Sequence, residues 1–161
     1  MSDSSVIDAI DRGILAVLQQ DASLSNAQLA ARVGLSPSPC WRRVRRLERE
    51  GVIRGRVALL DLDKLGMGIV VFASVKLSGH GRQALPEFES AIREYPEVLE
   101  CYTVTGEVDF ILRIVTQDMH TYENFLRHHL LQMPTVAEVH STIALTQVKY
   151  TTALPIGPLP A

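Results

Sequence analysis

The residue types that point most directly to chemistry in this sequence are arginines: Arg42, Arg43, Arg45 and Arg46 fill four of five consecutive positions. No acidic residue follows them before Glu48. A guanidinium group pairs with phosphate oxygens and can also bind the edge of guanine through two hydrogen bonds. The arginines therefore predict a surface that binds nucleic acid. The alternative is an ordinary helical hairpin whose arginines are only solvated.

The segment 35–54, which carries these arginines, has the start and stop signals of a helix. Ser36 can accept hydrogen bonds from the first free amides, and Pro37 and Pro39 fill first-turn positions where a missing N–H costs little. Gly51 stands where a left-handed residue commonly follows the last turn. An apolar stripe at helical spacing consists of Cys40, Val44 and Leu47. A helix that is apolar on one stripe and cationic elsewhere fits a groove lined with phosphates.

Two amphipathic segments before this helix complete a helix-turn-helix unit. Apolar residues repeat at helical spacing over residues 6–20, which predicts a first helix. Ser25 and Gln28 have the spacing of a capping box, which predicts a second helix over 26–33, and a glycine directly after it permits the turn. Residues 6–53 are therefore expected to form a three-helix, winged-helix-like DNA-binding domain.

The spacing of apolar residues changes after the third helix. Alternation predicts strands, whereas apolar residues three or four apart predict helices. The expected elements are a strand over 68–77, a helix over 82–95, strands over 98–105 and 107–116 joined at Gly106, a helix over 119–133 between Asp118 and Pro134, and a strand over 136–149. This order is typical of a ferredoxin-like βαββαβ domain with an antiparallel sheet, so the expected fold class is α+β.

Turn residues and prolines set the remaining domain limits. Residues 54–67 are expected to form a linker strand and a turn-rich connector. Residues 68–150 would be the ferredoxin-like domain, and residues 151–161 a Pro-rich, loosely held tail.

The expected sheet carries apolar side chains on the face that no predicted helix would cover. These are Val70, Phe72, Ile111, Val115, Ile143 and Leu145. Such a face is usually polar when only one side of the sheet is packed, so we expect a second copy of the chain to cover it. A two-fold dimer would present two basic helices to a pseudo-palindromic site in double-stranded DNA.

Composition and charge favour a globular protein with a basic front part. Of the 161 residues, 47% are hydrophobic and 21% are charged. Residues 1–56 carry nine Arg and six acidic residues, whereas residues 57–161 carry seven basic and twelve acidic ones, so only the first part is expected to meet nucleic acid. The sequence shows no signal-peptide pattern and no apolar run long enough for a bilayer, which makes the cytoplasm the expected location.

Motifs for catalysis or metal binding are absent from the sequence. Cys40 and Cys101 stand in no CxxC pattern and the five histidines in no tight ligand motif, so we expect no disulfide, metal or cofactor. No nucleophile elbow, P-loop or dinucleotide fingerprint occurs, so an enzyme is not expected. Both cysteines are expected in the core, although the place of Cys40 in a first turn beside arginines would also suit a redox-sensitive thiolate.

In these combined features the chain resembles the Lrp/AsnC family of bacterial and archaeal transcription regulators, over about residues 6–150. The residues that carry the resemblance are Asp11-Arg-Gly-Ile-Leu15, the segment 35–53, Asp61-Leu-Asp-Lys-Leu-Gly66, Thr105-Gly-Glu-Val-Asp-Phe110 and Leu130-Leu-Gln-Met-Pro134. The resemblance implies that the second domain binds a small effector, usually an amino acid, between dimers. It also implies homodimers that assemble into tetramers or octamers. The expected function is therefore a sequence-specific transcriptional regulator that responds to an amino acid.

The resemblance also implies effector-binding positions, of which Gly106 and Asp109 come first. Asp109 suits an α-ammonium group, and Gly106 lets backbone amides approach a carboxylate. The further positions implied are Thr103, Glu107, Met119, Thr142, Ile143 and Ala144. Relatives often have Asp and an aromatic residue where this chain has Glu107 and Val108, which bears on the identity of the effector.

For DNA, the N-terminal end of a recognition helix usually faces the base edges. We expect Arg42 to be the main specificity residue, near Ser36, Ser38 and Pro39. Trp41 can either stack near the DNA backbone or cover the edge of the core. The expected phosphate contacts are Arg43, Arg45, Arg46 and Arg54.

Two other functions stay open at this point. The protein could be mainly an architectural DNA-wrapping protein, although such proteins tend to be strongly basic. It could also be an enzyme, because sirohaem decarboxylases resemble this family in both domains. Those enzymes have no need of a cationic recognition helix, which this chain retains.

Overall fold

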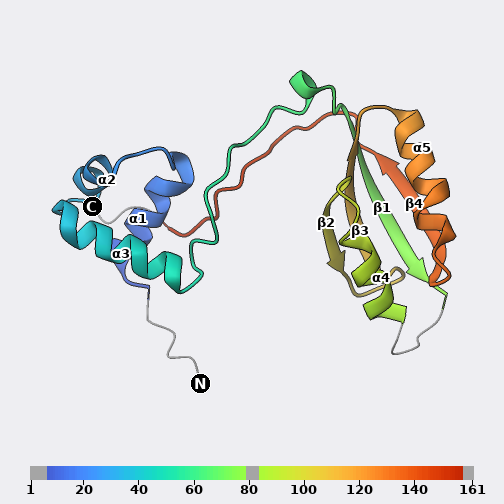
Figure 1. Ribbon diagram of the computed structural model, residues 1–161, viewed down its shortest axis with the longest axis horizontal. Coiled ribbons are helices and arrows are strands. Elements are labelled where there is room, and N and C mark those ends of the chain that lie inside the picture. The colour runs from blue at the N-terminus through green and yellow to red at the C-terminus, as the bar shows by residue number, and fades with distance from the viewer. Residues whose placement is uncertain (1–6, 79–83, 158–161) are drawn as a thin grey trace. The chain divides into compact units, whose positions relative to one another are not determined.

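The computed structural model describes residues 7–78 and 84–157, and the chain divides into two compact units (Figure 1). The first, called the head below, consists of the residues up to Ala58 together with those from Lys149 onward. The second, the sheet unit, is Leu59–Val148. The expected α+β class, with helices in the head and a ferredoxin-like sheet after them, is confirmed. Within the described residues, no helix has the length and apolar character needed to cross a membrane.

The described part of the head contains three helices: α1 is Ala9–Gln20, α2 is Asn26–Arg32 and α3 is Pro37–Arg49. Their apolar faces meet in one core, as the helical spacing predicted. The buried core residues are Ile14, Val17, Leu29, Ala30, Cys40, Val44 and Leu47. The whole apolar stripe predicted for α3 is therefore used to hold this helix against the other two.

The helix starts are capped in two of the three cases. Asp8 and Asp11 form a capping box, which explains why α1 begins later than the apolar pattern suggested. Ser25 and Gln28 form the predicted box on α2. The Ser36 side chain, however, makes no capping hydrogen bond to α3. A capping side chain accepts from the amide of the second or third helical residue, and Pro39 at the third position has no amide hydrogen to donate.

The start and end of α3 are set by left-handed glycines, as predicted. Gly34 has φ 68° in the turn before it and Gly51 has φ 73° after it. The Ile53 amide then donates to the Leu47 carbonyl over 3.1 Å, which turns the chain back onto the last turn of the helix.

The tail was expected to be loosely held, but its described part, residues 151–157, contacts α1. Gln19 binds Leu154 in both directions: its Nε2 donates to the Leu154 carbonyl (3.2 Å) and its Oε1 accepts from the Leu154 amide (2.5 Å). Arg12 Nη1 donates to the Ile156 carbonyl over 3.2 Å. These backbone contacts make the tail part of the head.

Outside residues 79–83, which are not described, the sheet unit contains a four-stranded antiparallel sheet and two α-helices. Its elements are β1 (Ile69–Leu77), α4 (Ala84–Ile92), β2 (Val98–Thr103), β3 (Phe110–Thr116), α5 (Met119–His128) and β4 (Val136–Ile143). The strands are ordered β2-β3-β1-β4, as in a ferredoxin-like fold, and every pair is antiparallel. The first residues of the helix expected over 82–95 lie outside the described part.

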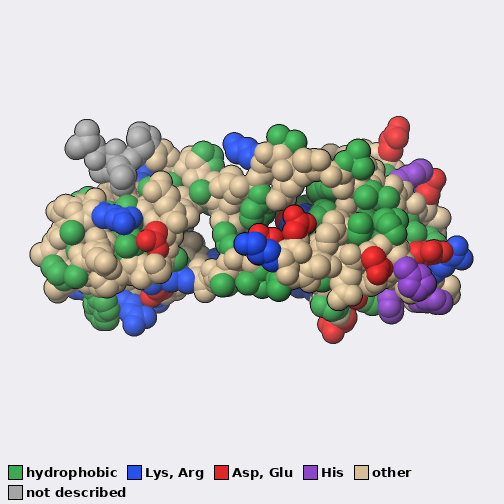
Figure 2. Space-filling view, turned by 90° about the horizontal axis from the view of Figure 1, so that it is seen from above, with side chains coloured by type: hydrophobic (Ala, Val, Ile, Leu, Met, Phe, Trp, Pro, Cys, Tyr) green, Lys and Arg blue, Asp and Glu red, His purple; other side chains and the backbone are tan. Residues whose placement is uncertain are grey.

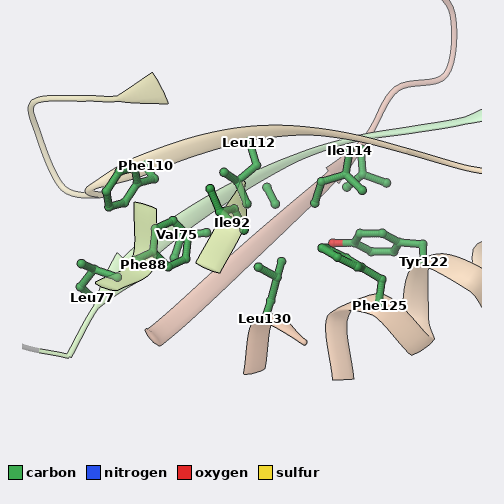
Figure 3. Packing of buried hydrophobic residues seen from close by; sticks show 12 residues of the cluster. Val75, Leu77, Phe88, Ile92, Phe110, Leu112, Ile114, Tyr122, Phe125 and Leu130 are labelled. Carbon is green, nitrogen blue, oxygen red and sulfur yellow. The ribbon is translucent and has the colours of Figure 1, made fainter. Parts of the chain in front are cut away.

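Both helices cover the same face of the sheet (Figure 3). Phe88 on α4 packs against Phe110 on β3, with ring centroids 4.6 Å apart. Tyr122 and Phe125 on α5 pack in the same core, and the Tyr122 hydroxyl is hydrogen bonded to the Ser141 hydroxyl on β4. Exclusion of this apolar surface from water is the main stabilising contribution in the unit.

Several predicted elements were too long, and one predicted strand is absent. The strands predicted over 98–105 and 107–116 are shortened to β2 and β3. β4 ends at Ile143 rather than residue 149, because Ile143 already pairs with Val71 and β1 begins at Ile69. α5 ends at His128, and a 3-10 turn, Leu130–Gln132, then buries Leu130 in the core. Residues 54–60 form no strand.

The uncovered face of the sheet is less apolar than predicted. Register with Val71 places Ile143 on the helix-covered face instead. Val115 is only 1% exposed, so it offers almost no surface to a second chain. Leu145 lies beyond the end of β4 and is therefore not part of the sheet. On β4 the uncovered face carries polar side chains, among them Thr142. Phe72, 43% exposed, remains as a large apolar side chain on that face.

Candidate DNA interface and effector site

Exposed side chains follow one side of α3, away from the core of the head. They are Ser38, Trp41, Arg42, Arg45 and Arg49, which recur three or four residues apart. Residues with this spacing share one side of a helix. This row, called the α3 outer face below, therefore presents three guanidinium groups to solvent.

Trp41, for which the sequence left two positions open, lies on the α3 outer face and is 51% exposed. The guanidinium carbon of Arg45 lies 5.6 Å from the centroid of its ring, within the range of a cation–π contact. Glu48 accepts from Arg45 and from Arg56, each over 3.2 Å. Arg45 is thus held between an aromatic ring and a carboxylate.

The other two arginines of α3, Arg43 and Arg46, bind aspartates of α1 and its cap. Arg43 Nη1 lies 2.7 Å from Asp8 Oδ2 and 2.9 Å from Asp11 Oδ1. Arg46 Nη2 donates to Asp11 Oδ2. Sequence reasoning placed both arginines at DNA phosphates, whereas the structure gives them acidic partners inside the head. These partners are 32 to 35 residues earlier in the chain, so no local pattern could have revealed them.

These contacts shift the ionisation of their members. The Asp11 amide donates to the Asp8 carboxylate, and this bond together with Arg43 holds the pKa of Asp8 below its ordinary value. The two carboxylates raise the pKa of Arg43. Burial raises the pKa of the Cys40 thiol, which favours the core role expected for this residue over the redox one. Cys101, also expected in the core, is exposed on β2.

The remaining predicted DNA residues lie at the ends of α3. Ser36 and Arg54 are exposed, whereas Pro39 is partly buried. Sequence reasoning missed Arg49, although its spacing of seven residues from Arg42 places it on the same helix side.

Asp109, the first predicted effector residue, has a structural role that the sequence did not reveal. Its Oδ2 accepts from the Leu77 amide over 2.8 Å, its own amide donates to Val75, and its carbonyl accepts from Val104. Asp109 therefore joins the β2–β3 hairpin to the end of β1. Gly106 at the tip has φ 128°, a conformation that side chains disfavour.

The predicted effector residues fall into two groups at opposite ends of the sheet. Thr103, Gly106, Glu107 and Asp109 form the hairpin group, beside Val75. Met119, Thr142, Ile143 and Ala144 form the second group, where the Ala144 amide donates to Val70. Val70 and Val75 are five residues apart, which corresponds to about 17 Å along a strand. One chain therefore does not bring the two groups together.

Among the described residues, no group of three or more His, Cys, Asp or Glu side chains is arranged to hold a metal ion. The described histidines all belong to the sheet unit. Figure 2 shows histidine side chains gathered near acidic ones at one end of the molecule.

Comparison with known proteins covers both units. Residues 7–54 match the model of a winged helix-turn-helix DNA-binding domain, and residues 70–154 match that of the Lrp/AsnC ligand-binding domain. The chain is 41% identical to the DNA-binding transcriptional activator DecR of Escherichia coli, over 94% of this chain and 99% of that protein. It is 39% identical to the leucine-responsive regulatory protein of the same species, over 93% and 92%.

Solved structures agree with these matches. A transcriptional regulator from Neisseria meningitidis, in complex with L-methionine, is 37% identical and superposes with a TM-score of 0.90 over 94% of this chain and 97% of that one. An AsnC family regulator from Agrobacterium tumefaciens is 43% identical, with a TM-score of 0.88 over 92% and 97%. With a DNA-binding head and a ligand-binding sheet unit, this chain belongs to the Lrp/AsnC family of transcriptional regulators.

Proposed function

We propose that this protein is a sequence-specific regulator in which the α3 outer face enters the major groove of DNA and an amino acid bound by the sheet unit alters that binding. The observation that carries the DNA part is the row of three exposed arginines on one side of α3. Arg42 lies nearest the N-terminal end of the helix, so it is our choice for a base contact. Arg45, Arg49 and Arg54 are our choices for phosphate contacts.

The chemistry of the hairpin supports an amino acid as the effector. Asp109 uses Oδ2 for the Leu77 amide, so an α-ammonium group would bind Oδ1. A carboxylate would bind backbone amides near Gly106, where the missing side chain permits close approach. The solved relative that contains L-methionine is consistent with this ligand class.

The separation of the two predicted effector groups supports a site shared between copies of the chain. The hairpin group of one chain can meet residues of the second group only when another chain places its second group beside that hairpin. Phe72, exposed on the uncovered sheet face, supports the expected homodimer, and further pairing of dimers would complete the effector sites. Effector binding would then act by favouring one assembly of heads over another.

The DNA part is tested with duplexes selected from a random pool by the full-length protein. We expect Arg42→Gln with Arg49→Gln to weaken binding to the selected duplex, since both remove groups from the α3 outer face. Arg12→Gln is the matched control, because Arg12 lies on α1 and contacts the tail. Equal effects of the double variant and the control would refute this use of α3.

The effector part is tested by thermal unfolding of the full-length protein with each of the twenty amino acids at millimolar concentration. A ligand that binds only the folded state raises Tm. We expect one chemical class of amino acid to do so. The absence of any shift would refute an amino-acid effector and favour the architectural function.

A further inference from the structure

We infer that Asp11 is a positioning residue that decides which arginines of α3 face the DNA. The inference rests on the proposed use of the α3 outer face and adds to it a division among the arginines. Arg42, Arg45 and Arg49 would serve DNA, whereas Arg43 and Arg46 would serve to hold the helix. Asp11 itself touches no DNA in this scheme.

Asp11 is placed to bind two successive turns of α3 at once. Its side chain is 0% exposed, and its two oxygens have different partners: Oδ1 accepts from Arg43 Nη1 over 2.9 Å and Oδ2 accepts from Arg46 Nη2. Oδ2 also accepts from the Asp8 amide over 3.1 Å. Asp8 Oδ2 in turn binds Arg43 Nη1 over 2.7 Å. Both arginine side chains are mostly covered, with 29% and 28% exposed.

Burial makes the contacts between Asp11 and the two arginines costly to break. A carboxylate without solvent is stable only when it is paired and hydrogen bonded, and Asp11 has both kinds of partner. Losing either arginine contact would leave part of a buried charge uncompensated. Asp11 therefore opposes any rotation of α3 that would turn Arg43 or Arg46 outward.

The spacing of the arginines explains why rotation matters. Successive residues of a helix differ by about 100° around its axis. Arg42 and Arg43 are successive residues and so differ by this angle, and the same holds for Arg45 and Arg46. A rotated helix would replace one row of guanidinium groups by the other and still offer positive charge, but with different geometry toward the bases. Asp11 is thus expected to affect specificity more than charge attraction.

Salt dependence of DNA binding separates the two groups of arginines. The experiment titrates full-length variants on a duplex of random sequence at several salt concentrations. Each phosphate contact that is removed lowers the slope of log affinity against log salt by about 0.9. We expect this decrease for Arg49→Gln and no decrease for Arg43→Gln, where Arg46 still pairs with Asp11. An equal decrease in both variants would overturn the inference.

A second measurement compares affinity for the selected duplex with affinity for the random one. We expect Asp11→Asn to lower this ratio about fivefold or more, the discrimination that one base contact can supply. Asp21→Asn is the matched control, since it removes the same charge from a partly exposed residue whose carboxylate binds Ser23. Mere loss of folded protein would weaken both affinities equally and leave the ratio unchanged.

The outcomes distinguish this inference from the proposed function. An unchanged ratio in Asp11→Asn, or a change equal to that of Asp21→Asn, would overturn the positioning role alone, provided that Arg42→Gln and Arg49→Gln still weaken binding. If those two variants bind as the wild type does, α3 is not the DNA surface and both the function and the inference fail. Should Asp11→Asn not fold, the comparison of Arg43→Gln with Arg49→Gln decides.

Discussion

Replacing Asp109 by Ala and by Asn separates its structural role from its proposed ligand role. The alanine variant removes the oxygen that accepts from the Leu77 amide over 2.8 Å. The asparagine variant keeps an oxygen in that place and removes the negative charge. The two substitutions therefore differ in the hairpin contact but agree in losing the charge that would bind an ammonium group.

The structure sets the expected size of each effect. Leu77 is only 7% exposed, so its amide would lose a partner in a nearly covered position, which costs about 1–3 kcal/mol. Asp109 itself is only partly buried, and water can replace part of the contact, so we expect the lower end of this range for Asp109→Ala. For a domain of this size, about 1 kcal/mol lowers Tm by about 4–8 °C. Asp109→Asn should change Tm much less.

The assay is thermal unfolding of each variant with and without the amino acid that stabilises the wild type. Both variants should bind that amino acid about 10- to 100-fold more weakly, the loss of one hydrogen bond to a charged group. Effector affinity equal to wild type in Asp109→Asn would refute the ligand role. An unchanged Tm in Asp109→Ala without ligand would refute the structural role.

Three further predictions concern the core, the head and the uncovered sheet face. Phe110→Ala should lower the free energy of unfolding of the sheet unit by about 3–5 kcal/mol, because Phe110 is 0% exposed and packs on Phe88. Urea unfolding measures this loss, and a loss under about 1 kcal/mol would contradict the packing. The folded-state pKa of Asp8 lies below its ordinary value of 3.8, so the stabilisation by this carboxylate is full above that value and is lost as the pH falls through the lower folded-state pKa. The urea midpoints of wild type and Asp8→Asn should therefore converge in acid. A difference between the midpoints that stays constant with pH would contradict the shift. Phe72→Arg should shift the protein toward monomers in sedimentation experiments with little change in Tm, whereas an unchanged sedimentation profile would show that this face is not the dimer contact.

Local sequence signals were sufficient for most elements of the fold. The capping box of Ser25 and Gln28 and the left-handed Gly51 each depend on residues only a few positions apart, and both predictions are confirmed. The alternation of apolar residues in β1 predicted which side chains of that strand are buried. Such signals reflect contacts within one element, which spacing alone determines.

Features that depend on register or on distant partners were predicted poorly. Whether Ile143 lies on the covered or the uncovered face depends on which residue of β1 pairs with it, and alternation on β4 alone does not fix this. The bond from Leu77 to Asp109 and the bonds from Arg43 and Arg46 to Asp11 join residues more than thirty positions apart. The distinction between arginines that face outward and arginines that hold α3 therefore required the structure.

The most direct test of the proposed regulation is a titration of the selected duplex with full-length protein, in the absence and presence of the amino acid that raises Tm. Coupling between two sites typically changes affinity 5- to 150-fold. We predict a change within about this range, in either direction, with the wild type and its loss in Asp109→Asn. Identical titration curves with and without a saturating amino acid would contradict an effector-controlled regulator.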